Sequence, residues 1–248
     1  MPRLGWLTAR PVAHRGLHDA SRGLIENTAS AFDAAITAGY GIECDVQRSR
    51  DGEAMVHHDG RLGRLTEGTA ALADLTAAEL RQTAFRGTAD HMLTLAELCA
   101  RVGGRVPLLV EIKSRFDGDL RLTRRVAEVL GGYSGPAAAM SFDPAALACL
   151  RESAPAITRG IVAESRYDHA DWARLSAAER RSLAFLLHAP RTRPHFVAWA
   201  VRDLPAAAPL VARHVFGLPL LTWTVRTAQD RARASRWADQ AIFEGFTP

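Results

Sequence analysis

The sequence predicts an α/β fold, specifically a (β/α)8 TIM barrel with a small insertion after the second strand. Short apolar runs alternate with longer amphipathic stretches along almost the whole chain, a pattern typical of βαβ units around a parallel sheet. About eight such runs fall within 248 residues, which favours a closed barrel over an open doubly wound sheet. No Pro-, Gly- or Ser-rich linker divides the chain, so we expect residues 1–248 to form one domain.

Continuous apolar runs mark the expected strands. Strands of a parallel sheet are covered on both faces, and for that reason they lack the strict alternation of a half-exposed sheet. Runs of about four to eight residues bounded by turn residues fit such strands. The expected strands are Val12–His14, Ile42–Arg48, Ala54–His58, Pro107–Lys113, Ala137–Phe142, Ile157–Ala163, Phe196–Val201, Leu218–Val225 and Gln240–Phe243.

Amphipathic stretches between these runs predict the helices, and several carry end signals. Gly39 and Gly131 follow two of them, because glycine readily adopts the left-handed conformation that ends a helix. Pro144 occupies a first helical turn, where its missing N–H group removes no helical hydrogen bond. The expected helices are Thr28–Ala38, Leu93–Val102, Leu120–Leu130, Pro144–Glu152, 177–188, 205–216 and 227–238.

One stretch, from Asp59 to Met92, interrupts this alternation. It is rich in Thr, Gly and Arg and contains no apolar run long enough to join a barrel. We therefore expect an insertion at about 59–92. Insertions of this kind usually lie over the C-terminal face of a barrel and shape substrate access.

The composition excludes several classes of protein. No apolar run approaches the roughly 20 residues of a membrane span, and the N-terminus lacks the apolar core of a signal peptide. We therefore expect a cytoplasmic protein without stable membrane association. The net charge of +4 comes from scattered arginines, so no nucleic-acid partner is expected. The three cysteines lack paired spacing and are expected to be reduced and buried.

Two of the expected strands carry carboxylates near their ends. Side chains alternate along a strand, so Glu43 and Asp45 share one face and Cys44 points to the other. Glu111 and Lys113 share a face in the same way. Either pair alone would equally fit a solvent-facing or ion-paired strand end. Three converging carboxylates without a thiolate would suit a hard cation such as Mg²⁺ or Ca²⁺.

Histidines lie at the ends of two other expected strands. His14 and Arg15 follow the first strand directly, and His57, His58 and Asp59 end another. Imidazoles titrate near neutral pH and can act as acid or base. The arginine fork matches two oxygens of a phosphate group. A lone histidine at a strand end is more often a structural residue, but two of them beside the carboxylate pairs favour a functional role.

In their order, these motifs resemble the glycerophosphodiester phosphodiesterase family, whose fold is similar to that of phosphatidylinositol phospholipase C. The resemblance covers residues 12 to about 225. It implies a metal-dependent barrel hydrolase that cleaves glycerophosphodiesters, which are small molecules, to an alcohol and sn-glycerol 3-phosphate. The matching motifs are Ala13-His14-Arg15-Gly16, Glu26-Asn27-Thr28, Glu43-x-Asp45, Val56-x-His58-Asp59, Leu93-Thr94-Leu95, Glu111-x-Lys113, Ser141-Phe142-Asp143 and Trp223-Thr224-Val225.

The resemblance also implies a role for each matching residue. The family pattern selects His58 of the two adjacent histidines, and strand alternation then sends His57 to the other side as a structural residue. Asn27 is expected to cap the helix that starts near Thr28. The implied set is His14 and His58 as the acid–base pair, Glu43, Asp45 and Glu111 as ligands of Mg²⁺ or Ca²⁺, and Arg15, Lys113 and Trp223 as substrate contacts. A purely core role would fit Trp223 equally well.

The chain departs from the family pattern at its C-terminus. Where many members end in Ile-Ile-Thr-Asp, this sequence has Ile242-Phe243-Glu244-Gly245, so an acidic position is shifted or lost. Two other functions stay open. A phospholipase C- or D-like enzyme would act on intact lipid or lysolipid and would need an apolar rim, which the polar stretch 59–92 does not supply. A barrel whose site has lost its catalytic function would bind phosphate without catalysing a reaction.

Overall fold

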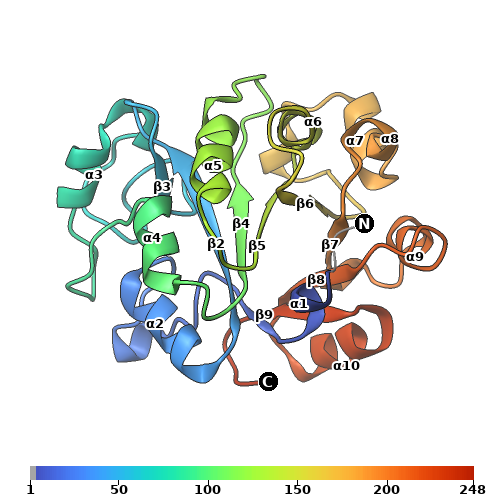
Figure 1. Ribbon diagram of the computed structural model, residues 1–248, viewed down its shortest axis with the longest axis horizontal. Coiled ribbons are helices and arrows are strands. Elements are labelled where there is room, and N and C mark those ends of the chain that lie inside the picture. The colour runs from blue at the N-terminus through green and yellow to red at the C-terminus, as the bar shows by residue number, and fades with distance from the viewer. Residues whose placement is uncertain (1–3) are drawn as a thin grey trace.

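The computed structural model describes residues 4–248 and confirms the (β/α)8 barrel (Figure 1). Eight parallel strands form a closed sheet, because β1 pairs with both β2 and β9: Val12 lies opposite Gly41 on one side and Ile242 on the other. The barrel strands are β1 (Val12–Ala13), β2 (Gly41–Arg48), β4 (Leu108–Ile112), β5 (Ala137–Ser141), β6 (Thr158–Ala163), β7 (Phe196–Ala200), β8 (Leu220–Val225) and β9 (Gln240–Phe243).

The expected strand Ala54–His58 is not a barrel strand. β3 (Ala54–Val56) pairs antiparallel with β2, with Val56 opposite Val46. The connection between the two strands is short enough for a hairpin, whereas a parallel strand needs a crossover of about a dozen residues or more. β1 and β3 also end earlier than expected, so His14, His57 and His58 follow the strands rather than belonging to them.

Helices surround the sheet, as Figure 1 shows. Thr94 begins α4 with a reciprocal capping box to Glu97. Thr28, not Asn27, is the N-cap of α2, so the expected cap is wrong. The helices are α1 (Gly5–Thr8), α2 (Ala29–Ala38), α3 (Ala77–Gln82), α4 (Leu95–Val102), α5 (Arg121–Gly131), α6 (Pro144–Ser153), α7 (Ala177–Ala184), α8 (Ala189–Thr192), α9 (Ala207–His214) and α10 (Ala228–Trp237), with 3-10 turns at Ala20–Arg22, Leu72–Asp74, Ala170–Trp172 and Val201–Asp203.

Residues 59–92 form the insertion, which contains α3 and lies beside β3 at the upper left of Figure 1. It packs around its own apolar cluster, in which Leu80 and Met92 are fully buried against Met55 of β3. This cluster gives the insertion a fixed shape without a barrel strand, because burying each such side chain is worth about 1.5–3 kcal/mol.

The barrel interior is apolar at the end that lies away from the C-terminal ends of the strands. Leu7 of α1 packs there with Val12, Leu109 and Phe196, so α1 closes that end. The polar residues of β2 and β4 therefore face the opposite, C-terminal end. Cys44, Cys99 and Cys149 are free and buried, as expected. Among the described residues, no helix has the length and apolar character needed to cross a bilayer.

Candidate active site

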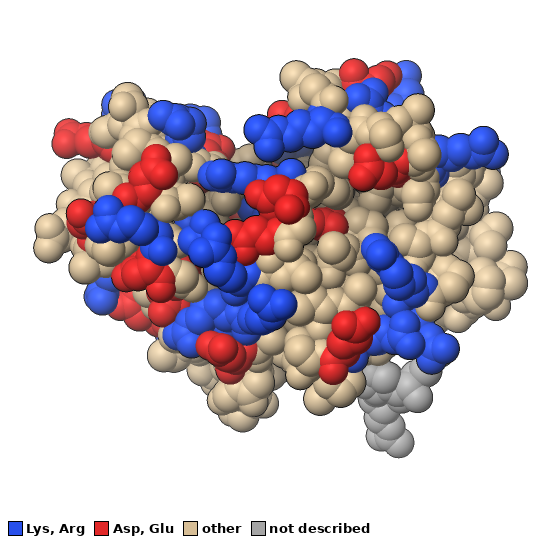
Figure 2. Space-filling view, turned by 90° about the horizontal axis from the view of Figure 1, so that it is seen from above, with Lys and Arg blue, Asp and Glu red and all other residues tan. Residues whose placement is uncertain are grey.

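A cavity of about 1120 Å³ opens at the C-terminal end of the barrel. Figure 2 looks onto this face, where Lys and Arg side chains gather around a depression with Asp and Glu among them. Residues at the ends of β1, β4, β5, β6, β7 and β8, or in the loops that follow them, contribute to its wall, as expected for this fold. Six of the predicted site residues line it: His14, Arg15, His58, Glu111, Lys113 and Trp223.

The other two predicted residues, Glu43 and Asp45, lie buried beneath the cavity. The register pairs Asp45 of β2 directly with Glu111 of β4, and Glu43 lies two residues earlier on the same face. One oxygen of each of these three carboxylates lies within 4.8 Å of the others. Strand alternation and the register between β2 and β4 therefore bring together the three acids that were predicted as metal ligands.

Charge in this carboxylate cluster is unevenly compensated. Burial, together with Asp45 and Glu111, raises the pKa of Glu43 well above its usual range. Burial opposes ionisation of Asp45 too, but Lys113 and Arg15 hold its pKa below the ordinary value. The Lys113 ammonium lies 2.7 Å from Asp45 Oδ1 and 2.6 Å from Glu111 Oε1. Lys113 is thus the main cationic partner of two of the three acids.

The donor set fits a hard divalent cation. All three carboxylates are buried, and Glu43 Oε1 has no hydrogen-bond partner among the described residues. A buried carboxylate oxygen without a partner is costly unless a cation or a proton compensates it. Oxygen-only ligands are those that Mg²⁺ and Ca²⁺ prefer. Glu43, Asp45 and Glu111 are therefore the residues that could hold such an ion.

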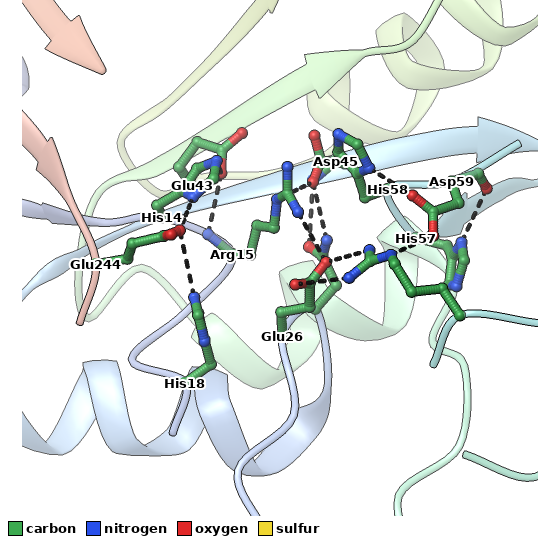
Figure 3. Close-up of polar contacts among 12 residues, drawn as sticks. His14, Arg15, His18, Glu26, Glu43, Asp45, His57, His58, Asp59 and Glu244 are labelled. Atoms are coloured by element: carbon green, nitrogen blue, oxygen red, sulfur yellow. Dashed lines mark hydrogen bonds and ion pairs between the residues drawn. The ribbon is translucent and has the colours of Figure 1, made fainter. Parts of the chain in front are cut away.

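His14 is fixed by an acid that the sequence analysis did not assign. Its Nδ1 contacts Glu244 Oε2, while its Nε2 lies 3.9 Å from Glu43 Oε2 (Figure 3). Glu244 directly follows β9 and also accepts a bond from Arg226 Nε at 2.5 Å. Burial lowers the pKa of His14, although Glu244 opposes this effect. Glu244, the acidic residue of the C-terminal motif, therefore contacts a histidine that lines the cavity.

The two adjacent histidines point in different directions (Figure 3). His58 lines the cavity, and its Nδ1 lies 2.7 Å from Asp59 Oδ1. His57 is 1% exposed, bonds the Asp59 carbonyl and packs against Phe85 in the insertion. Its position matches the structural role predicted for it.

Arg15 is held over the carboxylate cluster by two acids. Its Nε lies 3.1 Å from Asp45 Oδ2, and its Nη1 donates to Glu26 Oε1 at 2.8 Å. The Asn27 side chain, expected to cap α2, instead donates to Asp45 Oδ2 at 2.9 Å and accepts from the Asp45 amide. Both Arg15 and Asn27 adopt positive φ angles, 56° and 58°, a conformation that non-glycine residues seldom adopt.

Trp223 lines the cavity near the C-terminal end of β8. Its indole N–H donates to the Ala198 carbonyl at 3.0 Å, and its ring packs edge-on against Phe142. Phe142 in turn contacts Trp172. These three rings all line the cavity, which suits contact with the carbon skeleton of a ligand.

Comparisons with known proteins agree with this geometry. The model of the glycerophosphoryl diester phosphodiesterase family matches residues 14–247. The Bacillus subtilis protein YhdW, provisionally named a glycerophosphodiester phosphodiesterase, is 28% identical over 231 residues, covering 84% of this chain and 92% of its own. An Oleispira antarctica phosphodiesterase, solved with the product sn-glycerol-3-phosphate, superposes with a TM-score of 0.77 and 20% identity over 96% of this chain and 94% of that one. A Thermotoga maritima glycerophosphodiester phosphodiesterase gives a TM-score of 0.70 and 26% identity over 94% of both chains.

Proposed function

Because the chain belongs to the glycerophosphoryl diester phosphodiesterase family, we propose that it hydrolyses glycerophosphodiesters to an alcohol and sn-glycerol 3-phosphate. The observation that carries this proposal is the pair of cavity-facing histidines beside a buried three-carboxylate cluster. The cavity has ample room for a glycerophosphate group and a further alcohol. The product bound to the Oleispira antarctica phosphodiesterase is the one expected here.

We assign the metal-binding role to Glu43, Asp45 and Glu111. Their charges, together with those of Arg15, Lys113, a divalent cation and a phosphodiester monoanion, cancel, as a site shielded from water requires. Bound there, Mg²⁺ or Ca²⁺ would supply Lewis-acid polarisation of a phosphoryl oxygen.

His14 and His58 act as the acid–base pair in this proposal. Each presents its Nδ1 to a carboxylate, Glu244 for His14 and Asp59 for His58. That contact fixes the ring and leaves Nε2 to the substrate. One histidine accepts the proton of the attacking glycerol hydroxyl or water, and the other donates a proton to the leaving alkoxide.

Arg15 and Lys113 hold the phosphate in place. Both are positioned by buried acids before substrate arrives, so little side-chain entropy is lost on binding. Trp223, which also lines the cavity, packs against the glycerol or the alcohol in this proposal.

A substrate panel tests this function. Glycerophosphocholine, glycerophosphoethanolamine and glycerophosphoglycerol are incubated with Mg²⁺, Ca²⁺ or Mn²⁺, or with chelator, and sn-glycerol 3-phosphate is detected enzymatically. We expect metal-stimulated release of this product. Faster turnover of lysophosphatidylcholine than of glycerophosphocholine would instead indicate a phospholipase. Tight binding of sn-glycerol 3-phosphate without turnover of any diester would indicate a lapsed site.

A further inference from the structure

Arg64 links two carboxylates beside the cavity, those of Glu26 and Asp59. It lies in the insertion, outside all the motifs that the sequence analysis used. Its two terminal nitrogens bond both oxygens of Glu26, at 2.7 and 3.2 Å, and its Nε bonds Asp59 Oδ2 at 2.6 Å. One guanidinium thus bridges two carboxylates that come from different segments of the chain.

Each of these carboxylates also contacts a residue that faces the cavity. Glu26 Oε1 accepts from Arg15 Nη1 at 2.8 Å, and Asp59 Oδ1 lies 2.7 Å from His58 Nδ1. Figure 3 shows the resulting chain of contacts running from Arg15 through Glu26 to Asp59 and His58. Through Arg64, the phosphate-binding side of the site is tied to one of its two histidines.

The backbone around Arg64 is itself well anchored. Leu62 packs in the apolar cluster of the insertion, and the amide of Leu62 donates to Ala70 at 2.9 Å. Thr66 is fully buried, and its hydroxyl accepts from the Gly63 amide at 3.2 Å. The Leu65 carbonyl accepts from the Arg86 amide at 2.8 Å. Arg64 is therefore presented from a fixed turn and not from a free loop.

We propose that Arg64 is a positioning residue that holds Arg15 and His58 in their catalytic arrangement through Glu26 and Asp59. This inference rests on the proposed function. Without Arg64, two carboxylates lose their shared cation, and His58, whose side chain is 33% exposed, depends on an unsupported Asp59. Displacements of about 1 Å in such a site can cost on the order of 100-fold in rate. Lysine cannot replace the planar fork that engages both Glu26 oxygens and Asp59.

Kinetics of Arg64→Ala, Arg64→Lys and Arg81→Ala test the proposal. Arg81 is a matched control in the same insertion: its side chain is 47% exposed against 45% for Arg64, and it forms one ion pair, with Glu97 at 2.6 Å, away from the site. We expect kcat to fall at least tenfold in both Arg64 variants and to stay within twofold of wild type in Arg81→Ala. Millimolar guanidinium should raise the kcat of Arg64→Ala several-fold, whereas sodium at equal ionic strength should not.

A double-mutant cycle separates positioning from a general loss of structure. In a Glu26→Gln, Asp59→Asn background, Arg64→Ala should lower kcat by less than twofold, because its partners are already altered. Wild-type kcat in Arg64→Ala, or an undiminished fall in that background, would overturn the proposal. If the wild type releases no sn-glycerol 3-phosphate, the proposed function fails. In that case ¹⁵N–¹H spectra of the His58 ring test the positioning role of Arg64 instead. Ring signals that shift in Arg64→Ala but not in Arg81→Ala would support this role, and signals that do not shift in Arg64→Ala would refute it.

Discussion

Position 113 carries the one lysine among 31 basic residues of the chain. Its compact ammonium fits between Asp45 and Glu111, at 2.7 and 2.6 Å, with 19% of the side chain exposed. A guanidinium is wider and planar, so it cannot approach both acids without displacing a ligand of the expected cation. We expect Lys113→Arg to lower kcat/KM by at least about tenfold, equivalent to roughly 1.4 kcal/mol. Wild-type kinetics of the variant would show that position 113 requires only a positive charge.

The adjacent histidines give a second test at single residues. His58 faces the cavity, and His57 is buried against Phe85 of the insertion. Steady-state kinetics of His58→Ala should show kcat reduced by about 10²–10⁴, the range typical for loss of a positioned acid or base. His57→Ala should affect mainly the free energy of unfolding, measured in urea. A larger loss of kcat in His57→Ala than in His58→Ala would reverse the two roles.

Single residues were predictable where strand alternation decides their direction. Alternation brought Glu43 and Asp45 to one face, and the parallel register then placed Glu111 beside Asp45. Glu244 and Arg64 were not assigned, because their partners lie 230 and 38 residues away in sequence. Only the closed barrel brings such residues together. The acidic departure at the C-terminus was the one signal that could have pointed to Glu244.

At the scale of elements, bonds to Asp59 stabilise the start of the insertion. Burial alone would raise the pKa of Asp59, but bonds to Arg64 and His58 lower it to about 2. The unfolded chain, with an ordinary Asp pKa near 3.8, binds this proton first as pH falls. The stability that Asp59 contributes is therefore present above about pH 4 and is lost as pH falls towards 2.

Urea unfolding of wild type and Asp59→Asn at several pH values measures this contribution. The gap between their free energies of unfolding should shrink between pH 6 and pH 2, by about 1 kcal/mol once solvent screening of this partly exposed pair reduces the effect. A gap that does not change with pH would mean that Asp59 is not ion-paired in solution.

Elements were predicted best where they are long and apolar. All eight barrel strands lie within one or two residues of their expected bounds, because buried runs such as Leu108–Ile112 have no alternative structure of comparable burial. The run that forms β3 predicted a strand but not its antiparallel pairing with β2, since an apolar run shows that a strand is buried but not which strand it pairs with. The short helix α3 was missed, because it is stabilised by Leu80 in the local cluster of the insertion and by a capping box at Thr76.

For the whole molecule, cation binding should appear as added stability. Anything that binds the folded state alone stabilises it by mass action, by about 2.7 kcal/mol at a hundredfold excess over Kd. For a chain of this size that corresponds to a rise in Tm of about 5–10 °C. Differential scanning calorimetry with Mg²⁺ or Ca²⁺ should show this rise in wild type and a much smaller one in Glu43→Gln. Equal shifts in both proteins would place the cation elsewhere.

The central claim is that the three-carboxylate cluster holds a divalent cation that hydrolysis of glycerophosphodiesters requires. Its most direct test is the rate of sn-glycerol 3-phosphate release from glycerophosphocholine by metal-free enzyme, before and after Mg²⁺ or Ca²⁺ is restored, in wild type and in Glu43→Gln. Metal-free wild type should show no turnover and should recover fully when the cation is added, whereas a folded Glu43→Gln variant should show none at the same cation concentration. Full activity of the wild type after exhaustive chelation, with metal content verified, would contradict it.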